Sequence, residues 1–466
     1  MRTGLTWRRP PVDEFDVLCL GAGVCGEAIG GELKGSGLTV AVVESGLVGG
    51  ECPYWGCVPS KTLLRSGETL AESGRARQLA ASKVEWTVDM PKISKRVLWM
   101  ARDLDDTNPA KALEAAGAVL VRGEGQLTGP RTIDVGGRRL TARKALIVAT
   151  GSEPVVPPIP GLQGTPFWTN RDAVLPKALP ESLAILGGGA IGAELAQAYG
   201  RIGCRVELIE AGPRLVAAEE PEASDALQPH LEADGVKVHL GMRCTGVEHS
   251  EAGFKLQLEG AQPVTAEKLL VATGRKARLG SVDLAAAGLA TTERGWLKVN
   301  PSTLEAAGGI FAGGDVTGIG GFTHLAFYHG QVITMRLLGG DNRADHTAVP
   351  RVTFTDPEVA SVGISEKGAF ERNIDAVTVV TDPGETARGY IHDFKGGVVK
   401  LVADRQARVL VGATIVQPRA GEMLGELSLA VKQRIPLREL SDLIHPFPAF
   451  SRVLGAALRE LHVKAR

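Results

Sequence analysis

Two cysteines and a lysine are the residues of this chain whose types and spacing are best suited to chemistry. Cys52 and Cys57 are five positions apart, and Lys61 lies four positions further on. Five residues of a regular helix rise about 7.5 Å and turn through about 500°, which is too far for a disulfide. Pro53 suits a first helical position, and Gly56 permits an irregular backbone after it. The segment therefore predicts a distorted helix that holds a redox-active disulfide.

The surroundings of the two cysteines decide their reactivity. A thiolate close to a helix N-terminus, with Lys61 one turn away, is expected to have a lowered pKa. Zinc binding is the competing interpretation, but zinc needs four ligands, and no second Cys or His pair with ligand spacing lies nearby. The other cysteines have no regular spacing and are expected to be reduced and buried: Cys19, Cys25, Cys204 and Cys244.

A glycine-rich motif precedes the cysteines and has the order strand, glycine turn, helix, strand, acid. Its residues are Gly21, Gly23 and Gly26, followed by Glu44 at the end of the next apolar run. Glycines in this pattern let the backbone approach a pyrophosphate, and the acid can accept hydrogen bonds from ribose hydroxyls. The helix N-terminus offers unpaired N–H groups to the phosphates. The motif predicts a dinucleotide-binding unit.

The same arrangement occurs a second time, with Gly187, Gly189 and Gly192 followed by Glu210. In both units the acid lies 23 positions after the first glycine. Two dinucleotide sites imply two cofactors, and electron transfer between them is the economical reason to hold both. A duplicated scaffold with one inactive site is the alternative.

Length and composition agree with a large redox protein. The 466 residues suggest about three domains, and an apolar content of 44% supports large cores. With 52 basic and 53 acidic side chains the net charge is −1, so nothing indicates nucleic acid or an anionic membrane as partner. No apolar stretch approaches a membrane span, and residues 1–12 are expected to be a mobile extension. We expect a cytoplasmic protein.

These motifs together resemble the two-domain flavoprotein disulfide reductases, which include dihydrolipoamide dehydrogenase, glutathione reductase and mercuric reductase. The resemblance covers roughly residues 13 to 460. Besides the cysteine pair and the two glycine motifs, it rests on two Ala-Thr-Gly turns and two longer segments: 149–151, 272–274, 310–315 and 356–363.

The resemblance assigns cofactors to the two glycine motifs. It implies that the first motif binds the adenosine half of FAD and that Asp315 hydrogen-bonds the ribityl chain. The second motif is implied to bind a nicotinamide dinucleotide, together with Gly274. Further residues matched to FAD contacts are Gly50, Glu51, Lys61, Gly125, Thr150 and Gly151.

Catalytic roles follow from the same match. Cys57 corresponds to the cysteine that faces the flavin, and Cys52 to the interchange cysteine that meets the outside disulfide. Lys61 and Glu194 correspond to an ion pair near the reactive nitrogen of the flavin. A cation at that edge stabilises negative charge on the reduced flavin, and the carboxylate orients the lysine.

The choice of nicotinamide cofactor depends on the residue at the end of the second strand. Glu210 can accept a hydrogen bond from a free 2′-hydroxyl and repels a 2′-phosphate, so NAD is favoured over NADP. Arg214 lies close enough in sequence to leave NADP as the alternative.

The resemblance also implies an α/β fold with two Rossmann-like dinucleotide-binding domains and an α+β C-terminal dimerisation domain. The expected FAD domain is discontinuous, over residues 13–153 and 275–348. The expected nicotinamide domain covers 154–274, and the interface domain 349–466. The partner implied by that last domain is a second copy of the chain, with active sites shared in the homodimer.

The C-terminal segment departs from the family. The disulfide-reducing members end in His-x-His-Pro-Thr-x-Ser-Glu, whose second histidine acts as acid and base, whereas residues 445–452 read His-Pro-Phe-Pro-Ala-Phe-Ser-Arg. Phe447 occupies the position of the base, and Arg452 that of its glutamate. Using His445 as the base leaves Phe450 at the glutamate position. Because a placed imidazole contributes about 10²–10⁴ in rate, ordinary lipoamide or glutathione turnover is expected to be poor.

Three functions remain open. The first and preferred is a disulfide oxidoreductase acting on a small disulfide or dithiol, with His445 or water moving protons. The second is a flavin reductase that passes electrons to a quinone, a metal ion or another acceptor, and the third is a noncatalytic redox sensor. Mercuric reduction is disfavoured because residues 461–466 contain no cysteine pair, and glutathione reduction is disfavoured by Glu210. Tyr54 and Trp55 are expected either to line a substrate mouth with Phe447 or to pack at the interface.

Overall fold

The computed structural model describes residues 12–466, which fold into two compact units. Unit 1 contains the chain up to Val58 together with Leu98–Val155 and Arg275–Asp345, and unit 2 contains Pro59–Val97, Val156–Gly274 and His346–Arg466. The extension expected at residues 1–12 lies outside the described residues, except for the backbone of Val12 at the start of the first strand.

Unit 1 is built on a mainly parallel sheet with the strand order β16-β17-β6-β1-β2-β3. Residues 17–20 of the central strand are almost fully buried, as an apolar strand of a parallel sheet covered on both faces should be. Strands β4 and β5 extend the sheet beside β6. The strands are β1 (Val12–Leu20), β2 (Val40–Glu44), β3 (Val119–Arg122), β4 (Gly125–Gly129), β5 (Thr132–Val135), β6 (Arg138–Val148), β16 (Glu305–Ala307) and β17 (Ile310–Ala312).

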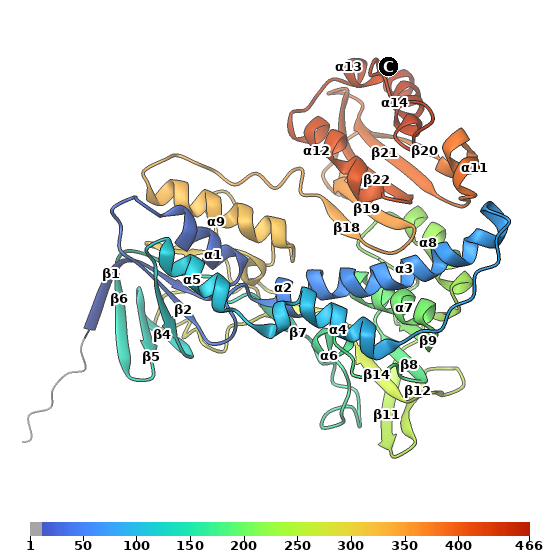
Figure 1. Cartoon of the computed structure of the whole chain (residues 1–466). Coiled ribbons are helices and arrows are strands. Elements are labelled where there is room, and N and C mark those ends of the chain that lie inside the picture. The colour runs from blue at the N-terminus through green and yellow to red at the C-terminus, as the bar shows by residue number, and fades with distance from the viewer. Residues whose placement is uncertain (1–11) are drawn as a thin grey trace, which may run out of the picture. The chain divides into compact units, whose positions relative to one another are not determined.

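Alternate residues of these strands enter two hydrophobic cores. Val17 and Cys19 face one core with helices α1 and α9, whereas Leu18 and Leu20 face the other. Helices α1 and α9 pack against each other on the first face (Figure 1). The helices of unit 1 are α1 (Val24–Glu32), α2 (Glu51–Tyr54), α5 (Thr107–Ala115) and α9 (Thr323–Leu337), with the 3₁₀ turns η1 (Arg102–Leu104) and η2 (Asp315–Thr317).

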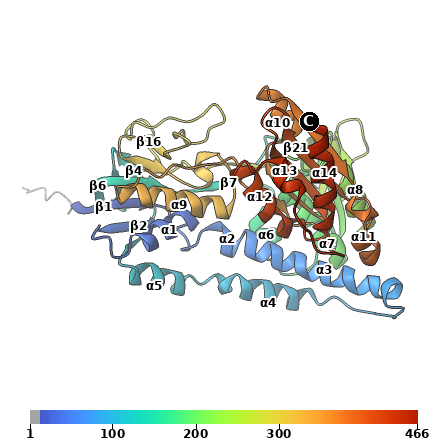
Figure 2. The same cartoon turned by 90° about the horizontal axis from the view of Figure 1, so that it is seen from above.

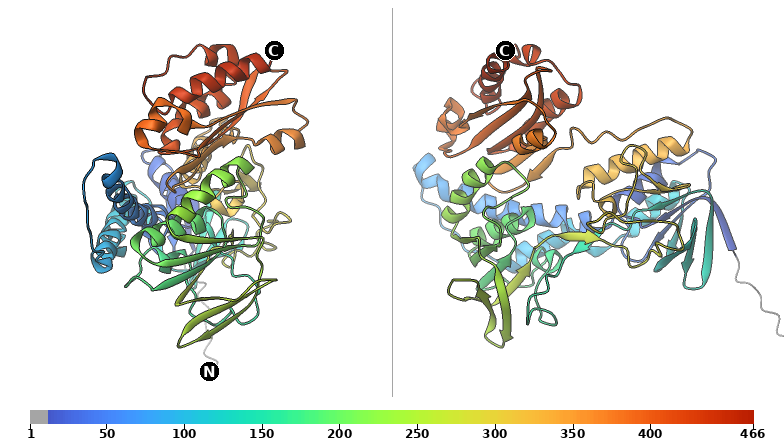
Figure 3. Two further views of the ribbon diagram at one scale, coloured as in Figure 1. Left: turned by 90° about the vertical axis from the view of Figure 1, so that its right-hand side faces the viewer. Right: turned by 180° about the vertical axis from the view of Figure 1, so that it is seen from behind.

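Unit 2 contains a second parallel sheet, with the order β10-β9-β8-β14. Helix α7 packs against β9 and helix α8 against β10. Strands β11, β12 and β13 form a separate antiparallel sheet (Figure 3). The elements are α6 (Asn170–Ala173), β8 (Ser182–Leu186), α7 (Ala190–Ile202), β9 (Arg205–Glu210), α8 (Pro221–Ala233), β10 (Val236–Leu240), β11 (Cys244–Ser250), β12 (Gly253–Leu258), β13 (Val264–Ala266) and β14 (Lys268–Val271).

Helices α3 and α4 also contribute to unit 2, where they run alongside each other (Figure 2). Helix α3 is Cys57–Leu79 and begins at the boundary of the two units, and α4 is Met90–Met100. Apolar residues of α3 such as Leu63 share one core with the parallel sheet and α7. The short strands β7 (Ser152–Pro154) and β15 (Arg275–Ala277) pair at the chain crossings next to residues 155 and 275.

The last part of unit 2 is a five-stranded antiparallel sheet with the order β18-β19-β22-β21-β20. Helices α12, α13 and α14 share one hydrophobic core with it. The elements are β18 (Arg351–Thr353), β19 (Glu358–Gly363), α10 (Glu366–Glu371), β20 (Ala376–Thr381), η3 (Pro383–Glu385), α11 (Ala387–His392), β21 (Val398–Asp404), β22 (Val409–Gln417), η4 (Ala420–Met423), α12 (Leu424–Lys432), α13 (Leu437–Ser441) and α14 (Arg452–Lys464).

The predicted α/β class is therefore confirmed, with two parallel sheets and one antiparallel C-terminal sheet. The boundaries of three ligand-binding and interface domains remain a prediction. No helix in residues 12–466 is both long and apolar enough to span a membrane.

Candidate active site

The helix that carries the cysteine pair is broken between the two sulfur atoms. Cys52 lies in α2, Cys57 is the first residue of α3, and Trp55 ends α2 with φ −136°. At Gly56 a Cβ would lie 3.1 Å from the carbonyl oxygen of Glu51 and 3.2 Å from Cys52 Cα. The break lets the two thiols come into contact. The predicted distortion of the helix is present.

The protonation of Cys52 differs from the expectation. A hydrogen bond with Cys57 raises the pKa of Cys52 far above its usual range, and burial raises it further. The expected lowering of the thiol pKa is therefore wrong for this cysteine. A hydrogen bond with the Thr323 side chain lowers the pKa of Cys52, but it does not outweigh the hydrogen bond with Cys57 and the burial.

Thr323 is a residue of this site that sequence reasoning missed. Its Oγ1 lies 3.4 Å from Cys57 Sγ, and it is the first residue of the 15-residue helix α9. A hydroxyl that donates to a thiolate stabilises the negative charge, and a helix N-terminus adds to the effect. The sequence around Thr323 does not predict this contact, because Thr323 and Cys57 are 266 positions apart.

The aromatic residue beside the cysteines is internal. Tyr54 is 0% exposed, and its hydroxyl donates to the carbonyl oxygen of Val48 over 2.9 Å. The guanidinium of Arg102 lies 5.8 Å from the ring centroid. Tyr54 therefore packs inside unit 1 and does not line a substrate mouth. Phe447, in unit 2, is 73% exposed.

The first glycine motif has the geometry of a phosphate turn. Gly21 has φ +106°, and a Cβ there would collide with the carbonyl oxygen of Ala149. A Cβ at Gly26 would collide with the carbonyl oxygen of Gly21. Glu44 accepts from the N–H of Ala22 over 2.7 Å, which fixes the acid beside the turn. Only glycine satisfies these close approaches.

The surroundings of this turn fit the FAD that the resemblance implies. Thr150 has a buried hydroxyl oxygen without a hydrogen-bond partner in the described part of the chain, so it can serve a ligand group. Gly23 and Gly50 lie close together, since a Cβ on Gly50 would be 3.0 Å from Gly23 Cα. The surface beside the glycine turn is therefore formed by backbone atoms. Asp315 accepts from the hydroxyl of Ser152 over 2.6 Å. Hydroxyls, a carboxylate and bare backbone suit ribityl and pyrophosphate groups.

Three other residues matched to cofactor contacts have different surroundings. Gly125 lies in the core of β4, where a Cβ would meet the side chains of Val43 and Leu20 at 2.7 and 2.8 Å, so packing accounts for this glycine. Glu51 lies 3.6 Å from the guanidinium of Arg278. Gly151 has φ +73° and open space around its Cβ position.

The second glycine motif repeats the first almost contact for contact. Gly187 has φ +110°, and a Cβ there would collide with the carbonyl oxygen of Ala272. A Cβ at Gly192 would collide with the carbonyl oxygen of Gly187, just as a Cβ at Gly26 would collide with that of Gly21. Glu210 accepts from the N–H of Gly188 over 2.6 Å. Gly189 and Gly274 have no atom within 4 Å of their Cβ positions in residues 12–466, which leaves room for a ligand.

Arg214 is held by its own loop. Its guanidinium donates to the carbonyl oxygens of Glu219 and Ala217, each over 2.8 Å, and contacts Ser224 at 3.4 Å. These bonds occupy donors that a 2′-phosphate would require.

The ion pair expected of Lys61 and Glu194 is present in unit 2. Lys61 Nζ lies 2.7 Å from Glu194 Oε2 and 3.0 Å from Oε1. Glu194 is 4% exposed on α7, so its carboxylate is buried and not solvated. A buried carboxylate with both oxygens on one ammonium fixes the direction of the lysine.

His445 is buried in the C-terminal part of unit 2. Its Nε2 lies 3.1 Å from Glu426 Oε1, on α12, and the position of a Gly455 Cβ is 2.8 Å from its Nδ1. The proton-carrying role of His445 stays a prediction, and this burial disfavours it.

The remaining cysteines are free, and no group of metal-ligating residues occurs in the described part of the chain. Burial raises the pKa of Cys25 and that of Cys204 to about 12, which leaves both thiols unreactive. Cys19 is buried as expected, whereas Cys244 is only half-buried.

The chain matches known families over most of its length. Residues 15–330 match the model of the pyridine nucleotide-disulphide oxidoreductases, and residues 349–458 match the dimerisation domain of the same proteins. The second match coincides with the antiparallel sheet and its helices.

Individual relatives are of more than one kind. A mercuric reductase of Staphylococcus aureus is 33% identical over 452 residues, which cover 95% of this chain and 82% of that protein. A dihydrolipoyl dehydrogenase of Thermus scotoductus is 32% identical, with coverage of 97% and 98%. The HOCl-induced flavoprotein disulfide reductase RclA from Escherichia coli is similar in structure, with a TM-score of 0.83, 26% identity and coverage of 95% and 99%.

Proposed function

Because the chain belongs to the pyridine nucleotide-disulphide oxidoreductase family, which uses FAD and NAD(P)H, we propose that it reduces a small disulfide through Cys52 and Cys57. The balanced reaction is NADH plus a proton plus one disulfide giving NAD⁺ plus two thiols, or its reverse. The observation that supports this most is the contact of two thiols across a break in the helix, because packing alone does not require it.

The residues have separate tasks in this proposal. Bound FAD would supply two-electron transfer between the nicotinamide and the cysteine pair. Cys52 attacks the outside disulfide, and Cys57 then attacks Cys52 in the mixed disulfide and releases the second thiol. Thr323 stabilises negative charge on Cys57 by donating to its sulfur. Lys61, oriented by Glu194, places a positive charge for the reduced cofactor.

We propose NADH as the preferred reductant. Glu210 stands at the turn where a ribose 2′-hydroxyl would lie, and its charge opposes a 2′-phosphate. The bonds from Arg214 to its own loop support this choice, since they leave its guanidinium poorly placed to compensate.

Proton transfer is expected to be the slow step of disulfide reduction in this protein. Phe447 and Arg452 replace the usual base and its glutamate, and His445 is buried against Glu426. Water is therefore the proton carrier in the proposal, and the dithiol substrate of dihydrolipoyl dehydrogenase is expected to turn over slowly.

This same feature favours a second candidate function, reduction of an acceptor that needs no imidazole. The structural relative RclA has also been obtained as a Cu(II) complex, and several relatives are mercuric reductases. A quinone or another metal ion fits this candidate, and a redox sensor without turnover is the third.

Activity on a panel of acceptors separates the candidates. NADH oxidation should be measured with lipoamide, several small disulfides, a quinone and Cu(II), for the parent protein and for Cys52→Ser. We expect a disulfide to be reduced and this activity to be lost in Cys52→Ser, while Cys244→Ser, a matched control at a half-buried thiol, retains it. Rapid oxidation with the quinone or metal alone, unchanged in Cys52→Ser, would establish the second candidate. If NADH is not oxidised with any acceptor, the redox sensor without turnover is the candidate that remains.

The dimerisation domain indicates that the protein works as a homodimer. Several large apolar side chains of this part are strongly exposed in the single chain, among them Ile444 at 96% and Phe447 at 73%. Burial of such residues is what a stable interface requires.

A further inference from the structure

The loop between β18 and β19 is bound along one face of helix α7. Glu194 accepts from the N–H of Phe354 over 2.8 Å. One turn later, Gln197 bonds both backbone groups of Asp356: its Oε1 accepts from the N–H and its Nε2 donates to the carbonyl oxygen, each over 2.7 Å. Residues three positions apart lie on the same helix face, so two consecutive turns of α7 hold consecutive parts of one loop.

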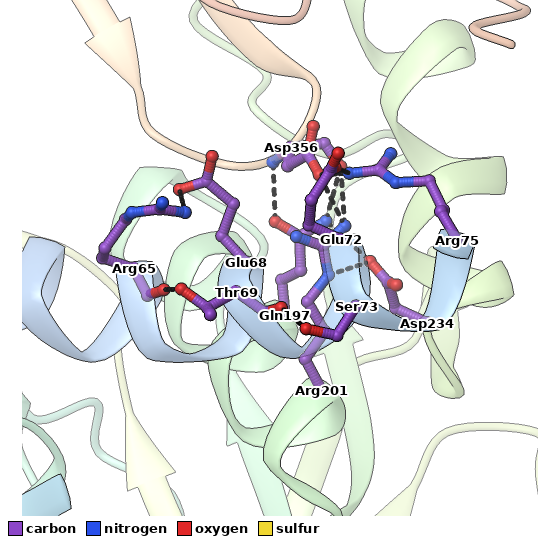
Figure 4. A network of polar contacts seen from close by, with 10 residues as sticks. All are labelled: Arg65, Glu68, Thr69, Glu72, Ser73, Arg75, Gln197, Arg201, Asp234 and Asp356. Atoms are coloured by element: carbon purple, nitrogen blue, oxygen red, sulfur yellow. Dashed lines mark hydrogen bonds and ion pairs between the residues drawn. The ribbon is translucent and has the colours of Figure 1, made fainter. Parts of the chain in front are cut away.

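A third turn of α7 completes the attachment, as Figure 4 shows. Arg201 donates to the carboxylates of Asp356 and Asp234, over 3.0 and 2.9 Å. Arg75 of α3 reaches the same Asp356 oxygen at 3.5 Å. Gln197 is 1% exposed, so loss of its bonds to the loop would leave its amide buried without a partner. The network therefore fixes the loop firmly.

The fixed loop contributes twice to the Lys61–Glu194 pair. Its backbone N–H at Phe354 engages Glu194 Oε1, the oxygen that also lies 3.0 Å from Lys61 Nζ. The Phe354 ring lies under the same ammonium, with Nζ 4.8 Å from the ring centroid. An ammonium is attracted to the face of an aromatic ring at this distance. The carboxylate and the ring together leave the half-exposed lysine little freedom to turn away.

We propose that Phe354, held by Gln197 and Arg201 through Asp356, is the positioning residue that sets the direction of the Lys61 ammonium. The role rests on the proposed function, in which Lys61 acts at the bound cofactor. The loop lies within the stretch that matches the dimerisation domain, at residues 349–458. That domain thus serves the site of its own chain through Phe354, in addition to forming the interface.

Redox potential tests the proposal without relying on turnover. We would compare the midpoint potential of FAD bound to the full-length protein in Phe354→Leu, Phe354→Tyr and Gln197→Met. Phe354→Leu removes the ring face, and Gln197→Met removes both bonds to Asp356. Each should weaken the stabilisation of the reduced cofactor about tenfold, which corresponds to a fall of about 30 mV for a two-electron couple. Phe354→Tyr, which keeps the ring, should restore the parent value.

Two controls make every outcome decisive. Phe370→Leu changes an 81% exposed phenylalanine of the same unit and should leave the potential unchanged. Lys61→Met should lower the potential more than any loop variant. If Lys61→Met has no effect, the role of Lys61 in the proposed function fails. If Lys61→Met lowers the potential but Phe354→Leu and Gln197→Met do not, the positioning role alone is overturned. If Gln197→Met does not fold, the difference in FAD midpoint potential between Phe354→Leu and Phe354→Tyr still tests the positioning role.

Discussion

The two glycine motifs of the chain have the same local geometry but lead into different surroundings. In each motif the first glycine has a positive φ, and a Cβ on the third glycine would collide with the carbonyl oxygen of the first. The acid of each motif accepts a hydrogen bond from the backbone N–H of the residue after the first glycine. Beyond the acid, the unit 1 chain runs to Gly50 and the cysteine helix, whereas the unit 2 chain runs to a loop closed by Arg214. The motif therefore specifies the geometry of the turn, whereas the segments that follow the two acids differ in structure.

Alanine in place of the third glycine should break each unit separately and with the largest effect. A Cβ at Gly26 or at Gly192 would overlap a backbone carbonyl, which costs about 1–3 kcal/mol or more. Gly26→Ala is expected to purify without FAD, and Gly192→Ala to keep FAD but lose NADH binding. Visible absorbance and nucleotide titration measure the two results.

Gly31→Ala is the matched control for unit 1. It lies on the same helix as Gly26, has no atom within 4 Å of its Cβ position in residues 12–466, and should stabilise the protein by up to about 1 kcal/mol. Retention of FAD by Gly26→Ala would show that the first motif does not serve this cofactor.

The pH dependence should separate the cysteine chemistry of unit 1 from the nucleotide chemistry of unit 2. The raised pKa of Cys52 keeps its thiol protonated to high pH, so the reactive thiolate fraction still increases from pH 7 to 9. We expect kcat/KM for the disulfide to rise about tenfold per pH unit over this range. The rate of FAD reduction by NADH, measured by stopped flow, should change little. A plateau reached near pH 7 would instead reveal a working base.

Glu210→Gln tests the acid of the second motif itself. Loss of the negative charge should lower kcat/KM for NADH about tenfold and narrow the discrimination against NADPH, because a 2′-phosphate is no longer repelled. Arg214→Gln is the partner experiment. Since this arginine is bound to its own loop, the variant should lose thermal stability and keep its cofactor preference. A selective loss of NADPH use in Arg214→Gln would contradict the assignment.

Thr323→Val is the mildest of these changes. Removing the hydroxyl beside Cys57 should slow alkylation of this sulfur about threefold at pH 7, as expected for the loss of one hydrogen bond. Iodoacetamide labelling in a Cys52→Ser background measures Cys57 alone at the site. Thr323→Ser, which keeps the hydroxyl, should react at the parent rate; equal slowing in both variants would argue for a packing effect.

Residues that act through local geometry could be predicted from the sequence. The glycine turns, their acids and the broken helix at Gly56 follow from spacing and backbone chemistry. The Lys61–Glu194 pair, 133 positions apart, was available only through the family resemblance.

Residues that act through tertiary contacts could not be predicted. Thr323 meets Cys57 only because α9 begins beside it, and Phe354 meets Lys61 only because α7 holds its loop. The burial of Tyr54 and the shared proton that raises the pKa of Cys52 likewise depend on folding. The cofactor contact of Gly125 stays a prediction, because the crowded core around it also requires a glycine and the sequence does not distinguish the two reasons.

In the proposed function, Cys52 and Cys57 exchange an electron pair with bound FAD. Anaerobic titration of the purified protein with NADH tests it most directly. We expect a two-electron reduced form that absorbs at long wavelength, through a Cys57 thiolate against the flavin, and that is absent in Cys57→Ser. Complete bleaching of the flavin by one equivalent of NADH, without such a band and identical in Cys57→Ser, would contradict it.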